Sequence, residues 1–249
     1  MRIVLSIFFL LSLVAFGGSS YGVQFESAKK QNFMNDLLPA IIEENKKIAL
    51  ERELVNNFFS KEFFLKLNGP NKQHNIQKLA KIAEKYKIND LFNKDEYLNK
   101  VDMIPPSMAV AQAVLETGWG ESEYARELNN YYGHYVFSKN LGFKGRAVKG
   151  KYERIRIFED IKDSVRAYML NLNIHTAYKG FRDARVRHRL AGGFIAGDSA
   201  IEYLSKYSIL KGSYIKRVKD VIYDNDLTIF DATMADVTNF KPNELISLY

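Results

Sequence analysis

The stretch "PPSMAVAQAVLETGWGES", residues 105–122, contains a strong helix together with the signals that begin and end it. The paired prolines cannot lie inside a helix but can open one, because the first helical turn has no amide hydrogen bond to lose. From Met108 onward the residues are good helix formers, and the small alanines allow a second helix to approach closely. Gly118 then ends the helix, since glycine adopts the positive φ common at helix C-termini. The segment predicts a closely packed helix in a mainly helical domain.

One carboxylate, Glu116, lies at the end of this helix beside the single tryptophan of the chain, Trp119. A helix C-terminus carries a partial negative charge and apolar surroundings disfavour ionisation, so both effects push this acid towards its protonated form. A carboxylic acid that stays neutral near pH 7 is what a glycosidase uses to protonate a departing glycosidic oxygen. The alternative is an ordinary helix-end acid that reaches solvent. The pattern alone leaves both interpretations open.

Helical periodicity recurs elsewhere along the chain, in residues 27–67, 76–88, 121–128 and 161–226. Pro39 is expected to mark a boundary or a kink between helical segments. Residues 152–158, "YERIRIF", alternate in the manner of a strand, so a small hairpin or a long loop is expected between the helices. The residues after Leu227 have a weak pattern and are expected to form a packed or loose tail.

The N-terminus has the features of a secretory signal peptide. Met1 and Arg2 supply a positive start, residues 3–16 are a 14-residue apolar run, and small residues follow. The run is shorter than the ~20 residues that span a bilayer. We therefore expect cleavage between residues 18 and 22, export to the periplasm or medium, and no further membrane segment. The expected divisions are a signal peptide (1–22), an N-terminal helical region (23–100), a main domain (101–227) and a C-terminal tail (228–249).

Composition excludes several classes of function. Hydrophobic residues make up 47% of the 249, enough for a substantial core. The formal net charge of +7 is spread along the chain, so a nucleic-acid partner is not expected. There is no cysteine, and the four histidines lack metal-ligand spacing. No disulfide, cysteine nucleophile, metal or other cofactor is expected, and the oligomeric state is left open.

Several ordered motifs resemble a known family. Residues 104–133, "IPPSMAVAQAVLETGWGESEYARELNNYYG", resemble the opening motif of the glucosaminidase domains of glycoside hydrolase family 73, "ALAQA.LESGWG.S..A" followed by "NL(F/Y)G". Residues 37–45 and 158–178 are similar to "LLPAI..EN" and "F....SVR.YM.NLN.H.AY...R" of the Bax-like branch, secreted proteins of Gram-negative bacteria. Residues 207–222 resemble the closing "Y....YI..V..MI". The resemblance covers roughly residues 30–225.

The resemblance implies a mainly α, lysozyme-like fold with a small β-hairpin lobe, preceded by N-terminal helices. It also implies cleavage of β-1,4 bonds next to N-acetylglucosamine in peptidoglycan. Glu116 matches the essential acid of the family, and Tyr207 matches a tyrosine near the cleft. The family holds a second carboxylate on the β-lobe, for which Glu153 is the nearest candidate, with Glu159 or Asp160 as alternatives.

Substrate-binding residues are expected around Glu116, because sugar rings stack their apolar faces on aromatic side chains. Tyrosines near a candidate acid can equally be core or turn residues, and Gln112 is more easily understood as a structural amide than as a ligand of the sugar. The positive charge of the chain suits peptidoglycan, which carries carboxylates on its stem peptides. The candidates are Gln112, Trp119, Asn130, Tyr131, Tyr132 and Tyr135.

Three functions remain open on the sequence. The favoured one is a secreted glucosaminidase with Glu116 as general acid. The second is a lytic transglycosylase, which also relies on one helix-end glutamate but releases anhydro-sugar ends. The third is a non-catalytic module that binds the cell wall or organises an envelope complex. The products of a peptidoglycan digest distinguish the three.

Overall fold

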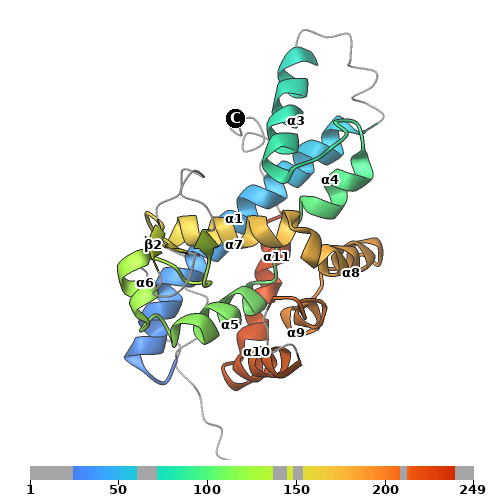
Figure 1. Ribbon diagram of the computed structural model, residues 1–249. Helices are drawn as coiled ribbons and strands as arrows, with labels where there is room; N and C mark the ends of the chain where they lie inside the picture. Colours follow the sequence, from blue (N-terminus) through green and yellow to red (C-terminus); the bar gives the residue numbers. More distant parts are fainter. Residues whose placement is uncertain (1–24, 61–71, 137–144, 148–153, 208–211, 239–249) are drawn as a thin grey trace, which may run out of the picture.

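The computed structural model describes residues 25–60, 72–136, 145–147, 154–207 and 212–238, which form a body of helices with a small sheet at one edge (Figure 1). The elements are α1 (Ala28–Phe58), α3 (Lys72–Tyr86), α4 (Lys94–Lys100), α5 (Pro106–Thr117), α6 (Glu123–Leu128), β1 (Tyr135–Val136), β2 (Gly145–Ala147), β3 (Arg154–Arg156), α7 (Ile161–Ile174), η2 (Thr176–Tyr178), α8 (Lys179–Leu190), α9 (Gly197–Ala200), η3 (Ile201–Tyr203), α10 (Gly212–Asp224), η4 (Leu227–Ala232) and α11 (Thr233–Asp236). This mainly α architecture with a small β lobe confirms the fold class predicted from the sequence.

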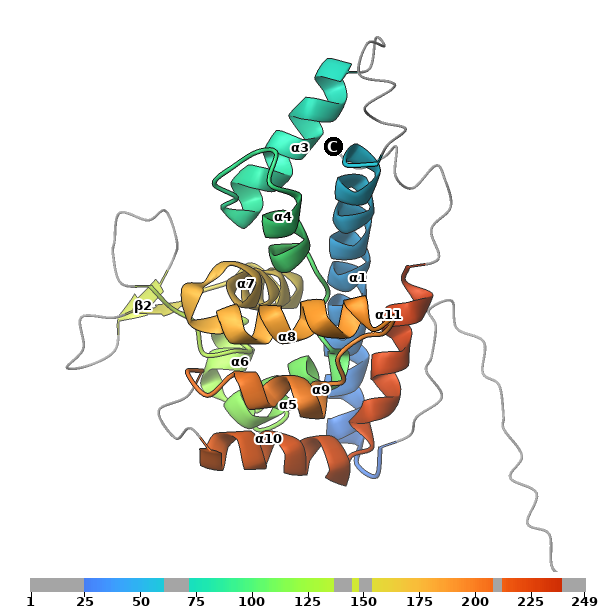
Figure 2. The same cartoon turned by 90° about the vertical axis from the view of Figure 1, so that its right-hand side faces the viewer.

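The long helix α1 runs along the molecule from the α10 end to α3 and α4 (Figure 2). Pro39 lies inside this helix, so of the two predicted alternatives the helix boundary is wrong, and the kink stays a prediction. Proline removes one backbone hydrogen bond, but Pro39 is exposed, so water can reach the carbonyl group that loses its partner. Its neighbours Leu38 and Ala40 are buried. Their packing holds the helix together across the proline.

The buried apolar side chains form two clusters in the described part of the chain. The larger cluster combines the first two thirds of α1 with α5, α7, α10 and the C-terminal turns. The smaller cluster joins the end of α1, including Val55 and Phe58, to α3 and α4. Figure 1 shows α3 and α4 standing apart from α10 and the β lobe. Since α1 contributes to both clusters, it connects the two parts of the molecule.

Helix α5 lies at the centre of the larger cluster. Its alanines Ala109, Ala111 and Ala113 are fully buried, which confirms that the helix is closely packed on its neighbours. The Asn45 side chain of α1 fixes the residue before the prolines, accepting from the Ile104 amide at 3.0 Å and donating to its carbonyl at 2.8 Å. At the other end, Gly118 adopts the left-handed conformation with φ +60°, as predicted for the helix stop.

A buried charge cluster ties the entry of α5 to three helices. Asp102 is 1% exposed and is approached by Arg52 of α1 at 3.6 Å and Arg185 of α8 at 3.7 Å, and it accepts hydrogen bonds from Arg189. Burial alone raises the pKa of a carboxyl group, but the three guanidinium groups hold the pKa of Asp102 below its ordinary value. The Arg185 side chain also donates to the carbonyls of Asp102 and Met103.

The β lobe is a three-stranded antiparallel sheet with the order β1-β3-β2. Tyr135 pairs with Ile155, which also pairs with Arg146 of β2. Ile155 is buried, as the alternation of residues 152–158 predicts. The sheet follows α6 in the chain and leads into α7, which places it beside the end of α5 (Figure 1).

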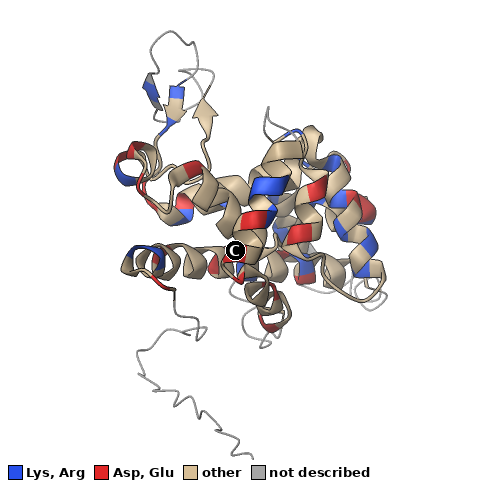
Figure 3. Cartoon of the chain, turned by 90° about the horizontal axis from the view of Figure 1, so that it is seen from below, with Lys and Arg blue, Asp and Glu red and all other residues tan. Residues whose placement is uncertain are grey.

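The segment that follows α10 also packs against the main core. Leu227, Phe230 and Met234 are buried in the larger cluster, so the first part of the expected tail is packed. No helix in the part of the chain that the structure describes combines the length and the apolar character needed to span a bilayer. Basic and acidic residues are interspersed along the described helices (Figure 3), in agreement with the spread of charge in the sequence.

Candidate active site

The carboxyl group of Glu116 lies where the last turn of α5 meets α10 and the turn before β1. The Tyr214 hydroxyl of α10 donates to Glu116 Oε1 at 3.4 Å. On the other side, a Cβ atom at Gly133 would lie 3.3 Å from Glu116 Oε2. Gly133 also has φ +65°, so both its conformation and its closeness to the carboxylate favour glycine. Two elements distant in sequence therefore bracket the acid.

The environment of Glu116 favours its protonated form. The side chain remains accessible to solvent, yet burial by the surrounding protein raises its pKa above the ordinary value of 4.5. The Tyr214 hydrogen bond and the charge of Arg217 act in the opposite direction and only partly offset this effect. A carboxyl group that holds its proton while water and ligands can reach it is suited to donate that proton to a bound substrate.

A chain of buried polar groups positions Tyr214. The Tyr168 hydroxyl donates to Gln112 Oε1 at 2.7 Å, and Gln112 Nε2 donates to the Tyr214 hydroxyl at 3.1 Å. Gln112 is fully buried one turn before Glu116, so it reaches the site through Tyr214 rather than through direct contact with a sugar. This is the structural role that the sequence favours for the amide.

Stacked tyrosines pack beside this series of hydrogen-bonded side chains. Tyr207 stacks on Tyr214 with ring centroids 5.7 Å apart, and its hydroxyl donates to the Tyr132 carbonyl at 3.4 Å. Tyr132 stacks on Tyr168 at 3.9 Å and is buried. Burial and the neighbouring tyrosines raise the pKa of Tyr207 well above its ordinary value, and the charge of Glu116 adds to this rise. Tyr207 thus belongs to the surroundings of the acid and is present as a neutral phenol.

The turn that carries Gly133 is held by Asn130. The buried Asn130 side chain donates to the carbonyls of His134 and Arg156, both at 2.9 Å, and accepts from the His134 amide at 2.9 Å. It joins the end of α6 to β3 and fixes the turn beside Glu116. Asn130 therefore acts on the site by positioning the backbone.

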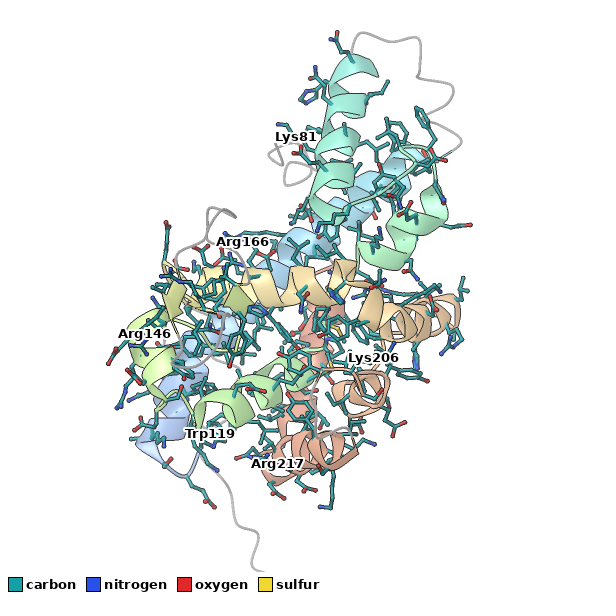
Figure 4. The ribbon with its side chains drawn as sticks, in the orientation of Figure 1. Lys81, Trp119, Arg146, Arg166, Lys206 and Arg217 are labelled. Atoms are coloured by element: carbon teal, nitrogen blue, oxygen red, sulfur yellow. The ribbon has the colours of Figure 1, made fainter. Side chains whose placement is uncertain are left out.

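Trp119 follows the helix stop with φ +64° and turns towards α1. Its ring meets Phe33 edge-on at 5.6 Å and Phe25 at 6.2 Å, and the Lys30 ammonium group lies 4.9 Å from the ring centroid. Figure 4 shows Trp119 at the end of α5. The sequence gives no signal for these contacts with α1. The ring is half-buried, so one part of it remains available to a ligand.

The two other candidate tyrosines differ in exposure. Tyr131 is half-buried against Phe33 at 6.2 Å, and its backbone amide donates to Ser164 Oγ at 3.1 Å. Tyr135 on β1 is 41% exposed. Among the sugar-stacking candidates, Tyr135 offers the most free surface and Tyr132 offers almost none.

The proposed second carboxylate, Glu153, lies outside the described residues. Of the two alternatives, Glu159 is exposed, and Asp160 caps α7 by accepting from the Asp163 amide at 2.8 Å. Within the described ranges no acidic side chain raises the pKa of Glu116. The same ranges hold no group of three or more histidine, aspartate or glutamate residues placed to bind a metal ion.

Sequence reasoning missed three residues of the site: Tyr214, Gly133 and Arg217. Gly133 stands in the "NYYG" motif, and its glycine could have been interpreted as a close backbone approach. Tyr214 and Arg217 are about one hundred residues from Glu116 along the chain. Only the packing of α10 on α5 brings them to the acid.

The helical fold and a solvent-accessible carboxyl group with a raised pKa fit one class of protein, the glycoside hydrolases. Comparison with known proteins supports this class and gives the family. The family model of Glucosaminidase, described as mannosyl-glycoprotein endo-beta-N-acetylglucosaminidase, matches residues 93–227, more than half of the chain. The chain belongs to this family and is a peptidoglycan-related glycosidase.

Two individual proteins are similar to the chain. Protein bax of Escherichia coli (strain K12) is 32% identical over 208 residues, which cover 81% of this chain and 71% of that protein. The catalytic domain of the autolysin Auto from Listeria monocytogenes matches with 16% identity and a TM-score of 0.37, over 73% of this chain and 87% of the autolysin chain.

Proposed function

We propose that the protein is an exported peptidoglycan hydrolase that cleaves β-1,4 glycosidic bonds at N-acetylglucosamine, with Glu116 as the general acid. The observation that carries this proposal is the state of Glu116, a carboxyl group accessible to solvent whose pKa is raised by burial. Membership of the glucosaminidase family supports the substrate class. The aromatic side chains around the acid are consistent with a glycan ligand.

In the proposed reaction the Glu116 proton moves to the oxygen that links two sugars, and the bond from that oxygen to the anomeric carbon breaks. The sugar that remains carries positive charge and must be attacked by water, by a second carboxylate or by its own acetamide group. We propose that Glu153, which directly precedes β3 in the sequence, supplies the second carboxylate. We expect it to lie beyond the ~5–5.5 Å of a direct nucleophile, because a lobe can move relative to a packed helix. Glu153→Gln should then lose less activity than Glu116→Gln.

A lytic transglycosylase is the second candidate. Such an enzyme relies on a single helix-end glutamate, and in the described part of the chain no other acid acts on the pKa of Glu116. In that reaction a hydroxyl group of the substrate, rather than water, attacks the anomeric carbon. The product then has an anhydro-sugar end in place of a reducing end.

The deciding experiment is mass spectrometry of purified peptidoglycan digested with the wild-type protein and with Glu116→Gln. New reducing N-acetylglucosamine ends, made by the wild type and lost in the variant, support the hydrolase. Anhydromuramic ends support the transglycosylase. A wild-type digest without new ends leaves a non-catalytic cell-wall-binding or scaffold role, and near-normal activity in Glu116→Gln removes the acid assignment.

Export is the remaining part of the proposal. A peptidoglycan substrate lies outside the cytoplasm, and the signal features of residues 1–22 agree with that location. N-terminal sequencing of the protein recovered from the periplasm or medium should give a start near residues 19–23. Recovery of an intact Met1 terminus in the inner membrane would contradict it.

A further inference from the structure

Arg217 is placed on the side of α10 that faces the candidate acid. It follows Tyr214 by three residues, so the two side chains project from the same face of the helix. Tyr214 contacts Glu116, which fixes the direction of that face. Figure 4 shows Arg217 on α10, close to the end of α5 that carries Trp119. Its side chain is exposed to solvent.

Arg217 differs from the other basic residues of α10 in having no acidic partner. Lys216 pairs with Asp220 at 2.7 Å, and Lys219 pairs with Glu202 at 2.5 Å. Within the described residues Arg217 takes part in no salt bridge and no hydrogen bond. Its charge acts on the pKa of Glu116, although the two groups do not come within the 4.0 Å of an ion pair. A substrate group can therefore lie beside the guanidinium group.

The charge of Arg217 works against the acid in the free protein. It lowers the pKa of Glu116 and so favours the ionised form, which cannot donate a proton. This effect disappears when a substrate anion neutralises the guanidinium group, because the net charge felt by Glu116 is then close to zero. An anionic substrate thus pairs with the Arg217 guanidinium group and raises the pKa of Glu116.

We propose that Arg217 binds a carboxylate carried by the glycan next to the bond that is cleaved, so that the enzyme selects acidic glycan strands over neutral ones. This inference rests on the proposed function, and it adds the charge of the substrate as the basis of selection. A planar guanidinium group suits a carboxylate because it can donate two parallel hydrogen bonds. In peptidoglycan the carboxylate comes from the stem peptide, or from the lactyl group once the peptide has been removed.

The test compares binding to insoluble peptidoglycan before and after its carboxylates are converted to neutral amides. Sedimentation binding is measured in the Glu116→Gln background, so the substrate stays intact. We expect Arg217→Gln to weaken binding to native peptidoglycan about three- to tenfold, the range for one charge-assisted pair that stays partly in water. On amidated peptidoglycan the same substitution should have no effect. Arg217→Lys should recover part of the loss.

Lys216→Gln is the matched control, because it removes the same charge from the same helix at a residue already paired with Asp220. Equal losses for Lys216→Gln and Arg217→Gln, or an equal loss on native and amidated material, would overturn the inference. Strands with the peptides removed carry only the lactyl carboxylate. A retained Arg217 effect on them shows that Arg217 binds this group as well, and a lost effect restricts its binding to carboxylates of the stem peptide.

The release of new glycan ends by protein with Glu116 intact separates this inference from the proposed function. A protein that releases no ends but still binds through Arg217 loses the proposed function and keeps only the part of the inference that concerns binding of glycan carboxylates. A protein that releases ends from native and amidated peptidoglycan at equal rates, with or without Arg217, keeps the function and loses the inference.

Discussion

Tyr214→Phe tests the link between the buried polar chain and the acid. The substitution keeps the ring that stacks on Tyr207 and removes only the hydroxyl group. That hydroxyl donates to Glu116 at 3.4 Å and accepts from Gln112 at 3.1 Å, so one atom serves two partners with different functions. Its removal should change the stability through Gln112 and the pH dependence of activity through Glu116.

The effect on stability follows from the burial of Gln112. Its side chain is fully buried, so the amide group that loses its acceptor cannot turn to water. A buried polar group left without a partner costs about 1–3 kcal/mol. In a chain of this length each kcal/mol lowers the melting temperature by about 2–4 °C, which gives a fall of about 2–12 °C.

The effect on activity has a definite sign. The Tyr214 hydrogen bond stabilises the ionised form of Glu116 and lowers its pKa, so its removal raises the pKa further. A general acid works only while it holds its proton, and activity is lost as the pH rises through its pKa. The alkaline limb of the activity profile should therefore move to higher pH in Tyr214→Phe.

The assay measures the release of glycan ends across the pH range, together with thermal unfolding, for wild type, Tyr214→Phe and Tyr223→Phe. Tyr223 is the control: it lies on the same helix, is 54% exposed and donates to Asp198, so its loss should change neither quantity appreciably. An alkaline limb that moves to lower pH would refute the assignment of Tyr214, as would a melting temperature equal to that of the control.

Three further substitutions test other parts of the structure. Glu116→Gln should lower turnover at least about 10²-fold. Because burial raises the pKa of the Glu116 carboxyl group in the folded state, the wild type loses stability as the pH rises from 4.5 through that pKa. The variant should therefore have a higher melting temperature than wild type at neutral pH, but not below pH 4.5. Asp102→Asn leaves the buried guanidinium groups uncompensated and should cost about 3–5 kcal/mol in urea unfolding; an unchanged midpoint would show that the cluster is not a stabilising element. Gly133→Ala should reduce turnover, because the added Cβ atom meets Glu116 Oε2. Gly192→Ala is the control: Gly192 has φ +85° and open space around it, so this variant should share the backbone strain and keep full turnover. Equal activities of the two variants would contradict the role of Gly133.

Local signals in the sequence predict α5 correctly, and the sequence also predicts the direction in which the pKa of Glu116 is shifted. The prolines, the alanines and Gly118 act through neighbouring residues, and the helix begins and ends where they indicate. The pKa of Glu116 is shifted in the predicted direction, but the cause of the shift is burial by the surrounding protein. Interactions between neighbouring residues determine the limits of α5, so these limits can be inferred without a structure.

Long-range packing determines what the sequence did not predict. The Tyr214 contact joins residues 98 positions apart, and no pattern shows which of the tyrosines meets the acid. Trp119 turns towards Phe33 of α1, which periodicity cannot indicate. Pro39 predicts a helix boundary by its own chemistry, but the buried residues on both sides keep α1 continuous.

The family match and the folded core of the molecule begin at different residues. The family match begins at residue 93, whereas α1 ends at Phe58 and still supplies Leu37, Ile41 and Ile48 to the main core. A fragment restricted to residues 93–227 would leave the apolar side of α5 and α7 in water. Its Trp119 would also lose the Phe33 ring that supports it. The segment that the family model matches therefore depends for its shape on a helix that lies outside that match.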